Sequence, residues 1–245
     1  MANALVRPPG PLLADGIVSY IERRPVDVVL ARAQWAAYVA ALESAGWNAV
    51  EIAPAEDCPD AVFVEDALVV KNGLAVVTRP GAEARRAELE TAEAAVRALG
   101  YTVARIEEPG TLDGGDVLTV GGTTYVGTGG RTNSEGARQL GRLLGTTVVE
   151  VPVAGVLHLK TAVTALPDDT IVGHLPPAVP FPAFQPVPEE SGAHVVVLDE
   201  RRVLIAADCP RSAELFASLG YDPFVVEIGE FQKLEGCVTC LSVLL

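Results

Sequence analysis

The chain has 245 residues, of which 49% are hydrophobic and 20% are charged, and its formal net charge is -14 at pH 7. This composition is typical of a globular protein and excludes a disordered or collagen-like chain. It also argues against a nucleic-acid partner, because 32 acidic residues outnumber 18 basic ones and the densest basic clusters are arginine pairs. A membrane span is not expected, since every apolar run is far shorter than the ~20 residues that crossing requires.

The length is compatible with one α/β domain, and we expect residues 1–245 to form a single catalytic domain. The first residues, MANALVRPPGPLLADG, contain one arginine and no long apolar stretch, so they do not resemble a secretory signal. We therefore expect a cytoplasmic protein. A reducing compartment would keep its four cysteines as thiols, available for chemistry or metal binding: Cys58, Cys209, Cys237 and Cys240.

Apolar periodicity repeats along the chain as two short strands, a helix and a further strand. Residues 28–52 indicate a helix and a strand without the two strands that would precede them. Residues 61–106 form the clearest complete unit. Its strands AVFVED and LAVVTRP flank a turn, a helix follows over residues 82–100, and a strand covers residues 101–106.

Residues 116–151 repeat this order, with Asn133 expected to cap the helix and Gly145 to end it. A third unit begins with the strands HLKTAVTAL and TIVGH, so that His158 is expected at the start of a strand. A fourth, residues 194–228, contains the strands HVVVLDE and RVLIA, a helix and the strand FVVEI. The last segment, CVTCLSVLL, is predicted to be an apolar strand containing Cys240.

The two ends of the chain can complete a fifth unit, which predicts a circular array closed by its own termini. Closure would leave fewer exposed sheet edges. The third unit departs from the pattern, because six prolines between Pro176 and Pro188 exclude a helix interior. We expect a polyproline-like loop or crossover there.

Several residues could carry chemistry, although each has an ordinary structural explanation. His158 could be a buried histidine satisfied by one hydrogen bond, and Cys240 a small core residue. The C-x-x-C pair Cys237 and Cys240 could be a redox pair or half of a zinc site, but no second pair supports a metal. TLDGGDVL could be a simple Asx turn. In FVED, one of the two adjacent carboxylates is expected to be buried and to need a cationic partner.

Six motifs in order along the chain together resemble the dimethylarginine dimethylaminohydrolases. They are DAVFVED (Asp60 to Asp66), TRPGAEARR (Thr78 to Arg86), TLDGGDVL (Thr111 to Leu118), GRTNSEGA (Gly130 to Ala137), LHLKT (Leu157 to Thr161) and TCLSVLL (Thr239 to Leu245). The resemblance implies the α/β pentein fold, a five-bladed αβ propeller of ββαβ units around a central active site. It also implies hydrolysis of Nω-methylated L-arginines to citrulline and dimethylamine or methylamine, through a covalent cysteine thiouronium.

The resemblance implies roles for individual residues. Cys240 matches the nucleophile, His158 the general acid and base, and Asp113 the carboxylate that orients the histidine. Seven further positions match residues around the substrate: Asp60, Phe63, Glu65, Asp66, Arg85, Arg131 and Leu234. Among these, Arg85 and Arg131 match contacts to the α-carboxylate. A mobile lid is expected between Leu12 and Val18, without a fixed register.

The expected partner is a small methylated arginine, with no metal or organic cofactor, no nucleic acid and no membrane, and a homodimer is left open. Two other functions are also left open. A related pentein, an arginine deiminase or an amidinotransferase, would share the nucleophile, histidine and carboxylates. A binding protein for arginine analogues would need the charged contacts but no nucleophile, so Cys240, His158 and Asp113 together argue against it.

Overall fold

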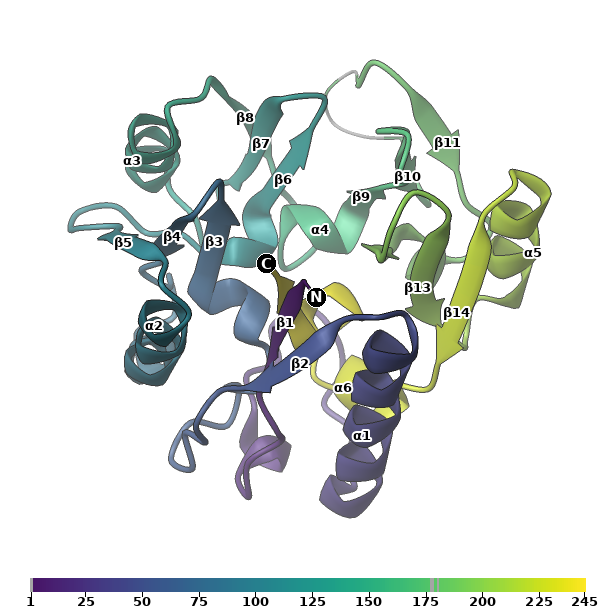
Figure 1. The fold of residues 1–245 in the computed structure, drawn as a ribbon, viewed down its shortest axis with the longest axis horizontal. Helices are drawn as coiled ribbons and strands as arrows, with labels where there is room; N and C mark the ends of the chain where they lie inside the picture. Colours follow the sequence, from purple (N-terminus) through teal and green to yellow (C-terminus); the bar gives the residue numbers. More distant parts are fainter. Residues whose placement is uncertain (1, 177–178, 180) are drawn as a thin grey trace.

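Five three-stranded sheets surround a common centre in the computed structural model, which describes residues 2–176, 179 and 181–245 (Figure 1). In each sheet the middle strand pairs antiparallel with one neighbour and parallel with the other. This pairing follows from the ββαβ order, because a short turn joins antiparallel strands and a longer crossover joins parallel ones. The predicted five-bladed αβ propeller is confirmed.

The first blade is built from both ends of the chain, as predicted. Strand β1 (Asn3–Val6) lies between β15 (Ser242–Leu244) and β2 (Asn48–Glu51), and the two termini lie side by side at the centre of Figure 1. Helix α1 (Val28–Ser44) precedes β2, and the Asp27 carboxylate caps it by accepting two backbone N–H groups. The array is therefore closed by a sheet that combines strands from both ends of the chain.

The second blade contains β3 (Leu68–Lys71), β4 (Leu74–Val77), α2 (Leu89–Ala98) and β5 (Thr102–Arg105). The predicted strand AVFVED is wrong, because its second half is the 3-10 helix η2 (Val64–Ala67) and β3 begins only after it. The cause lies in the backbone carbonyls of this segment. Those of Asp60 and Phe63 accept hydrogen bonds from the buried Arg85 guanidinium, each at 3.2 Å, and not from a neighbouring strand.

The third blade agrees with its prediction and has four elements: β6 (Val117–Val120), β7 (Thr123–Thr128), α3 (Ser134–Leu144) and β8 (Val148–Pro152). The Asn133 side chain accepts the N–H of Gly136 at 2.8 Å and caps α3. Gly145 ends the helix with φ at +60°, in the left-handed region that favours glycine.

The fourth blade differs from the prediction at two places. Its elements are α4 (Leu159–Ala162), β9 (Val163–Ala165), β10 (Ile171–Gly173) and β11 (Phe184–Pro186). His158 is the N-cap of the short helix α4 and does not start a strand, since the Asp116 carboxylate accepts the N–H of Leu159 and holds a helical turn there. The proline-rich segment supplies β11, which pairs parallel with β10. Residues 177, 178 and 180 lie outside the described part of this segment.

The fifth blade is confirmed, with β12 (Val196–Val197), β13 (Arg202–Ala206), α5 (Pro210–Ser218) and β14 (Asp222–Val226). After it come α6 (Gly229–Gln232) and η6 (Thr239–Leu241). The expected strand over CVTCLSVLL is therefore wrong in its first half, where the N–H of Cys240 bonds the carbonyl of Cys237 at 3.1 Å in a tight turn. Other short 3-10 helices are η1 (Leu13–Asp15), η3 (Glu83–Glu88), η4 (Gly114–Asp116) and η5 (Glu190–Ala193).

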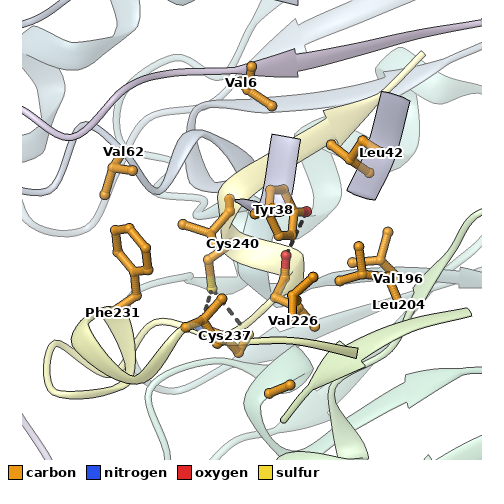
Figure 2. Close-up of a cluster of buried hydrophobic side chains, with 14 of the residues drawn as sticks. Val6, Tyr38, Leu42, Val62, Val196, Leu204, Val226, Phe231, Cys237 and Cys240 are labelled. Carbon is orange, nitrogen blue, oxygen red and sulfur yellow. Dashed lines mark hydrogen bonds between the residues drawn. The ribbon is translucent and has the colours of Figure 1, made fainter. Parts of the chain in front are cut away.

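A buried cluster packs the C-terminal turn against the first and fifth blades (Figure 2). The Tyr38 hydroxyl, from α1, donates to the carbonyl of Val238 at 2.9 Å and bonds the Ser242 hydroxyl at 2.8 Å. These contacts hold both ends of the turn that carries Cys240. Among the described residues, no helix combines the length and the apolar character needed to cross a membrane.

Candidate active site

A small cavity lies where segments from several blades meet. All of the predicted site residues except Asp113 and Glu65 line it. The lining residues are Ile17, Asp60, Phe63, Asp66, Arg85, Arg131, Leu157, His158, Leu234, Glu235, Gly236 and Cys240. The fold therefore brings together motifs that are separated by as many as 180 positions in the sequence.

His158 is held from behind by a carboxylate that has no access to solvent. Its Nε2 lies 3.0 Å from Oδ2 of Asp113, which is 0% exposed. The other oxygen of Asp113 accepts the backbone N–H of Gly81 at 2.9 Å. Burial would lower the pKa of His158, but the charge of Asp66 and the hydrogen bond with Asp113 outweigh it and raise that pKa to about 9. The imidazole is thus protonated at neutral pH.

The paired glycines of TLDGGDVL allow this close packing and are not explained by a turn. A Cβ at Gly115 would lie 2.6 Å from Nδ1 of His158, and one at Gly114 would lie 2.0 Å from the carbonyl oxygen of Glu65. Neither glycine has a positive φ. The alternative of a simple Asx turn is therefore insufficient, because the motif needs glycine for the approach of neighbouring groups.

Cys240 lies in the turn η6 with its sulfur close to a second thiol. The Sγ atoms of Cys237 and Cys240 are 3.2 Å apart, and the backbone N–H of Cys237 points to the Cys240 sulfur at 3.4 Å (Figure 2). The hydrogen bond between the sulfurs lowers the pKa of the Cys237 thiol and raises that of the Cys240 thiol, so Cys237 loses its proton more readily than Cys240. Of the two, Cys240 lines the cavity.

Asp66 presents an ionised carboxylate to the same cavity. Its Oδ2 accepts a hydrogen bond from Arg85 at 2.5 Å, and its Oδ1 accepts the N–H of Gly115 at 2.9 Å. Burial would raise the pKa of Asp66, but the charges of His158 and Arg85 outweigh it and lower that pKa to about 2. The expectation that one carboxylate of FVED is buried beside a cation is confirmed.

Arg85 lines the cavity, and its guanidinium donates hydrogen bonds to neighbouring protein groups. The buried guanidinium bonds both oxygens of Glu88, at 3.0 and 2.9 Å, in addition to Asp66. Arg131 has fewer partners: it lies 3.8 Å from Asp113 and bonds the Ser19 hydroxyl at 3.3 Å. Both arginines were expected to bind the α-carboxylate of the substrate. Of the two, Arg131 has fewer hydrogen-bond and ion-pair partners on its guanidinium.

Glu65 is not brought together with the other predicted residues. Its Oε1 accepts from Lys160 at 2.6 Å and its Oε2 from Thr239 at 2.9 Å. All three line a second cavity, next to residues of β3, β6 and β15. The neighbours Glu65 and Asp66 thus face different cavities, as do Thr239 and Cys240. A direct contact between Glu65 and a substrate stays a prediction.

Asp60 determines which residue of the N-terminal segment lies at the cavity, a point that could not be settled from the sequence. Its two oxygens accept the backbone N–H of Ile17 at 3.1 and 3.2 Å, and Ile17 lines the cavity. Burial raises the pKa of Asp60. A Cβ at Gly16 would lie 2.8 Å from Oδ1 of Asp60, so glycine permits the segment to pass close to this carboxylate.

Three lining residues were not predicted, Leu157, Glu235 and Gly236, whereas Ile17 lies within the segment expected to form the lid. Leu157 and Gly236 are adjacent to His158 and Cys237, so proximity to the motifs could have indicated them. Glu235 follows the predicted Leu234, but its contacts depend on an unusual backbone conformation with φ at +62°, for which the sequence has no signal. Lys160, the partner of Glu65, stands in the motif LHLKT and could have been proposed as its cation.

Three donor atoms in the site lie close enough to hold a metal ion. Among the described residues, atoms of Asp66, Asp113 and His158 lie within 4.8 Å of one another. However, His158 already bonds Asp113, and Asp66 bonds Arg85 and Gly115. The three side chains are therefore already engaged in hydrogen bonds within the site.

The fold and the composition of its central site define a pentein with a cysteine, a histidine and carboxylates around one cavity. A dimethylarginine dimethylaminohydrolase of Streptomyces coelicolor is 60% identical over 248 residues, covering 98% of this chain and 96% of that protein. The chain belongs to the dimethylarginine dimethylaminohydrolase family. No family model matches the sequence.

Two solved structures of this family cover the whole chain and are covered by it. One, from Pseudomonas aeruginosa, is a cysteine-to-serine mutant complexed with citrulline, with a TM-score of 0.93 and 35% identity. The other is a histidine-to-glycine mutant as an adduct with S-methyl-L-thiocitrulline, with a TM-score of 0.92 and 34% identity. Both confirm the pentein fold of this chain.

Proposed function

We propose that this chain hydrolyses Nω-methylated L-arginines, asymmetric dimethylarginine and monomethylarginine, to L-citrulline and dimethylamine or methylamine. The observation that carries the proposal is the cavity in which Cys240, His158 and Asp66 meet. It combines a thiol, a protonated imidazole and an ionised carboxylate, which are the groups that hydrolysis of a guanidinium requires. The complex of a related enzyme with citrulline supports the same product class.

The negative side of the site would hold the substrate cation. A guanidinium is planar and donates hydrogen bonds in the plane of its nitrogens, so carboxylates bind it through charge-assisted contacts. Asp66 is ionised and lines the cavity. It would therefore bind the substrate guanidinium and place its central carbon near the Cys240 sulfur.

Cys240 would act as the nucleophile. As a thiolate it attacks the central carbon, and the bond from that carbon to the methylated nitrogen breaks as His158 gives that nitrogen a proton. The amine leaves and a thiouronium remains on Cys240. The hydrogen bond with Cys237 and burial raise the pKa of the Cys240 thiol, so its ionisation would depend on the positive charges of the bound guanidinium and of His158.

His158 would then serve as the base for water. The neutral imidazole takes a proton from a water molecule that attacks the thiouronium carbon, and the carbon–sulfur bond breaks to regenerate the Cys240 thiolate and release citrulline. Asp113 keeps the ring in the orientation needed for both steps, because it bonds Nε2 and has no access to solvent. These steps require no metal or organic cofactor.

The amino-acid end of the substrate would be bound near the N-terminal segment. Arg131 offers a cation for the α-carboxylate and Asp60 an anion for the α-amino group, and Leu234 lines the same cavity. Phe63 supplies an apolar wall for the methylene chain, and its ring packs edge-on against Phe231 with the ring centres 6.3 Å apart. The substrate is therefore expected to be a free amino acid.

The test is a product assay with asymmetric dimethylarginine, arginine and agmatine side by side, measuring citrulline together with dimethylamine or ammonia. We expect equal amounts of citrulline and dimethylamine from dimethylarginine, and much slower reactions with the other two. Faster release of ammonia from arginine would overturn the proposal in favour of a deiminase. Binding of dimethylarginine without any product would favour a binding protein.

A further inference from the structure

Glu235 holds a backbone conformation that a glutamate adopts only at a cost. Helix α6 is followed by a turn in which the N–H of Gly236 bonds the carbonyl of Phe231 and the N–H of Glu235 bonds that of Gln232. This is the Schellman pattern, whose left-handed position usually holds glycine. Here Glu235 occupies it with φ at +62°. A side chain retained at such a position calls for an explanation.

The Glu235 carboxylate contacts the N-terminal segment through three consecutive backbone donors. Its oxygens accept the N–H groups of Ser19, Tyr20 and Ile21 at 2.8, 2.5 and 3.1 Å. Successive N–H groups that converge in this way form an anion-binding nest, and a carboxylate bonds them more strongly than a neutral acceptor does. Glu235 is thus a specific anchor for this segment.

Apolar packing contributes little to holding the same part of the segment. Tyr20 is 50% exposed and Ile21 is 42% exposed, so neither side chain is anchored in the core. Arg23 bonds the carbonyls of Ala14 and Gly16 and ties the segment to itself without attaching it to a blade. The attachment near residues 19–21 therefore depends on Glu235, with a weaker contact from Arg131 to the Ser19 hydroxyl at 3.3 Å.

We propose that Glu235 latches the N-terminal segment over the cavity and so positions Ile17 beside the substrate. Ile17 lies two residues before Ser19, lines the cavity and donates its N–H to Asp60. Glu235 also lines the cavity, between Leu234 and Gly236. Without the contact of Glu235 with the segment, Ile17 could move away from the cavity and lose its hydrogen bond with Asp60. Substrate binding would then be weaker. This role rests on the proposed function and assigns Glu235 as a positioning residue, not a catalytic one.

Two variants distinguish the effect of the Glu235 carboxylate from that of the backbone conformation at this position. Glu235→Gln keeps the size of the side chain and removes its charge. Glu235→Gly removes the side chain and suits the left-handed backbone, so the fold should be at least as stable as that of the unmodified chain. The matched control is Glu227→Gln, since Glu227 is exposed and lies outside the cavity.

The first readout is kinetic. For Glu235→Gly we expect KM for dimethylarginine to rise about 10-fold, the size of a lost charge-assisted contact, while kcat falls less than about threefold. Glu235→Gln should raise KM by a smaller factor in the same direction, and Glu227→Gln should leave both values unchanged. A thermal unfolding scan should show no loss of stability for Glu235→Gly, which a purely structural role would not predict.

The second readout does not depend on activity. Trypsin needs an extended, mobile chain around the bond that it cleaves, so cleavage after the exposed Arg23 should be faster when the segment opens. Glu235→Gly should be cut at this bond about 10-fold faster than the unmodified chain and the Glu227→Gln control, and Glu235→Gln should be cut faster by a smaller factor. Cleavage rates and KM values within twofold of the unmodified chain would overturn the latch. Faster cleavage with no turnover of dimethylarginine by any form would instead contradict the proposed function and leave the latch intact.

Discussion

The sulfur atoms of Cys237 and Cys240 lie 3.2 Å apart in one tight turn, with a backbone N–H of the first also pointing to the sulfur of the second. The C-x-x-C motif therefore places a hydrogen-bond donor beside the proposed nucleophile. Because Cys240 lines the cavity, the two thiols are expected to differ in function. Their separate replacement tests this difference.

Cys240→Ser should lower kcat at least about 1,000-fold while binding of citrulline persists, because a serine hydroxyl at this place is hardly ionised. Cys237→Ser should keep most of the activity, since its hydroxyl and backbone N–H can still donate to the Cys240 sulfur. Steady-state kinetics and calorimetric titration with citrulline measure both effects. A thiol alkylator should inactivate the unmodified enzyme, and saturating substrate should protect it. If Cys237 were the indispensable thiol, the assignment of the nucleophile would be wrong.

Protonation of His158 should make stability depend on pH. Its pKa is about 9 in the folded chain, against an ordinary value near 6.5, so the folded state binds the proton more tightly. The stabilisation is fully present below pH ~6.5 and is lost as pH rises to about 9, with an upper limit of about 3 kcal/mol. Urea unfolding between pH 6 and 10 measures it. His158→Gln should lack this fall, and equal pH profiles for both proteins would contradict the protonated imidazole.

Arg131 should discriminate between substrates with and without an α-carboxylate. Arg131→Ala is expected to lower kcat/KM for dimethylarginine about 10- to 150-fold, as for loss of a charge-assisted contact in a partly closed site. The weak reaction with agmatine, which lacks the carboxylate, should barely change. Parallel kinetics with both substrates give the answer. Equal losses for the two would show that Arg131 does not read the amino-acid head group.

Arg85 should affect stability more than specificity. Its side chain neutralises the buried Asp66 and Glu88, and removing one partner of a buried ion pair leaves uncompensated charge. Arg85→Ala should therefore lower the free energy of unfolding by about 3–5 kcal/mol, as measured by urea titration. Arg86→Ala is the matched control, because Arg86 is more exposed and pairs with a solvent-exposed Glu83. A stable Arg85→Ala protein with a selective loss of dimethylarginine binding would restore its role in head-group recognition.

Periodicity was sufficient to predict the five blades, because each strand and helix buries one face and repeats that pattern in its own sequence. It failed where side chains from distant segments determine the backbone. Arg85 donates hydrogen bonds to the carbonyls of Asp60 and Phe63, and the FVED segment therefore forms a 3-10 helix where a strand was predicted. The Asp116 carboxylate accepts the N–H of Leu159 and holds the helical turn after His158. Neither contact leaves a local signal in the sequence.

The composition of the site could be predicted only from the motifs taken together. Taken alone, Cys240 and His158 are ordinary buried residues, and TLDGGDVL is explained by turn chemistry. The role of Glu235 could not have been predicted from the sequence. It depends on a left-handed backbone conformation after α6 and on backbone N–H groups of the N-terminal segment, more than 210 positions away. The direction of Glu65, toward Lys160 and a different cavity, likewise follows from the tertiary structure.

The central claim is that a substrate carbon becomes bonded to Cys240 and is released with the help of His158. S-methyl-L-thiocitrulline tests it directly, since its methylthio group leaves without the protonation that an amine needs, whereas the later attack of water still requires a base. Mass spectrometry of the His158→Gln variant after mixing with this compound should show the mass of the compound less methanethiol, and fragmentation of the C-terminal peptide should locate it on Cys240 and not on Cys237. An unmodified protein that turns the compound over at the normal rate, or an adduct on Cys237 alone, would contradict the account.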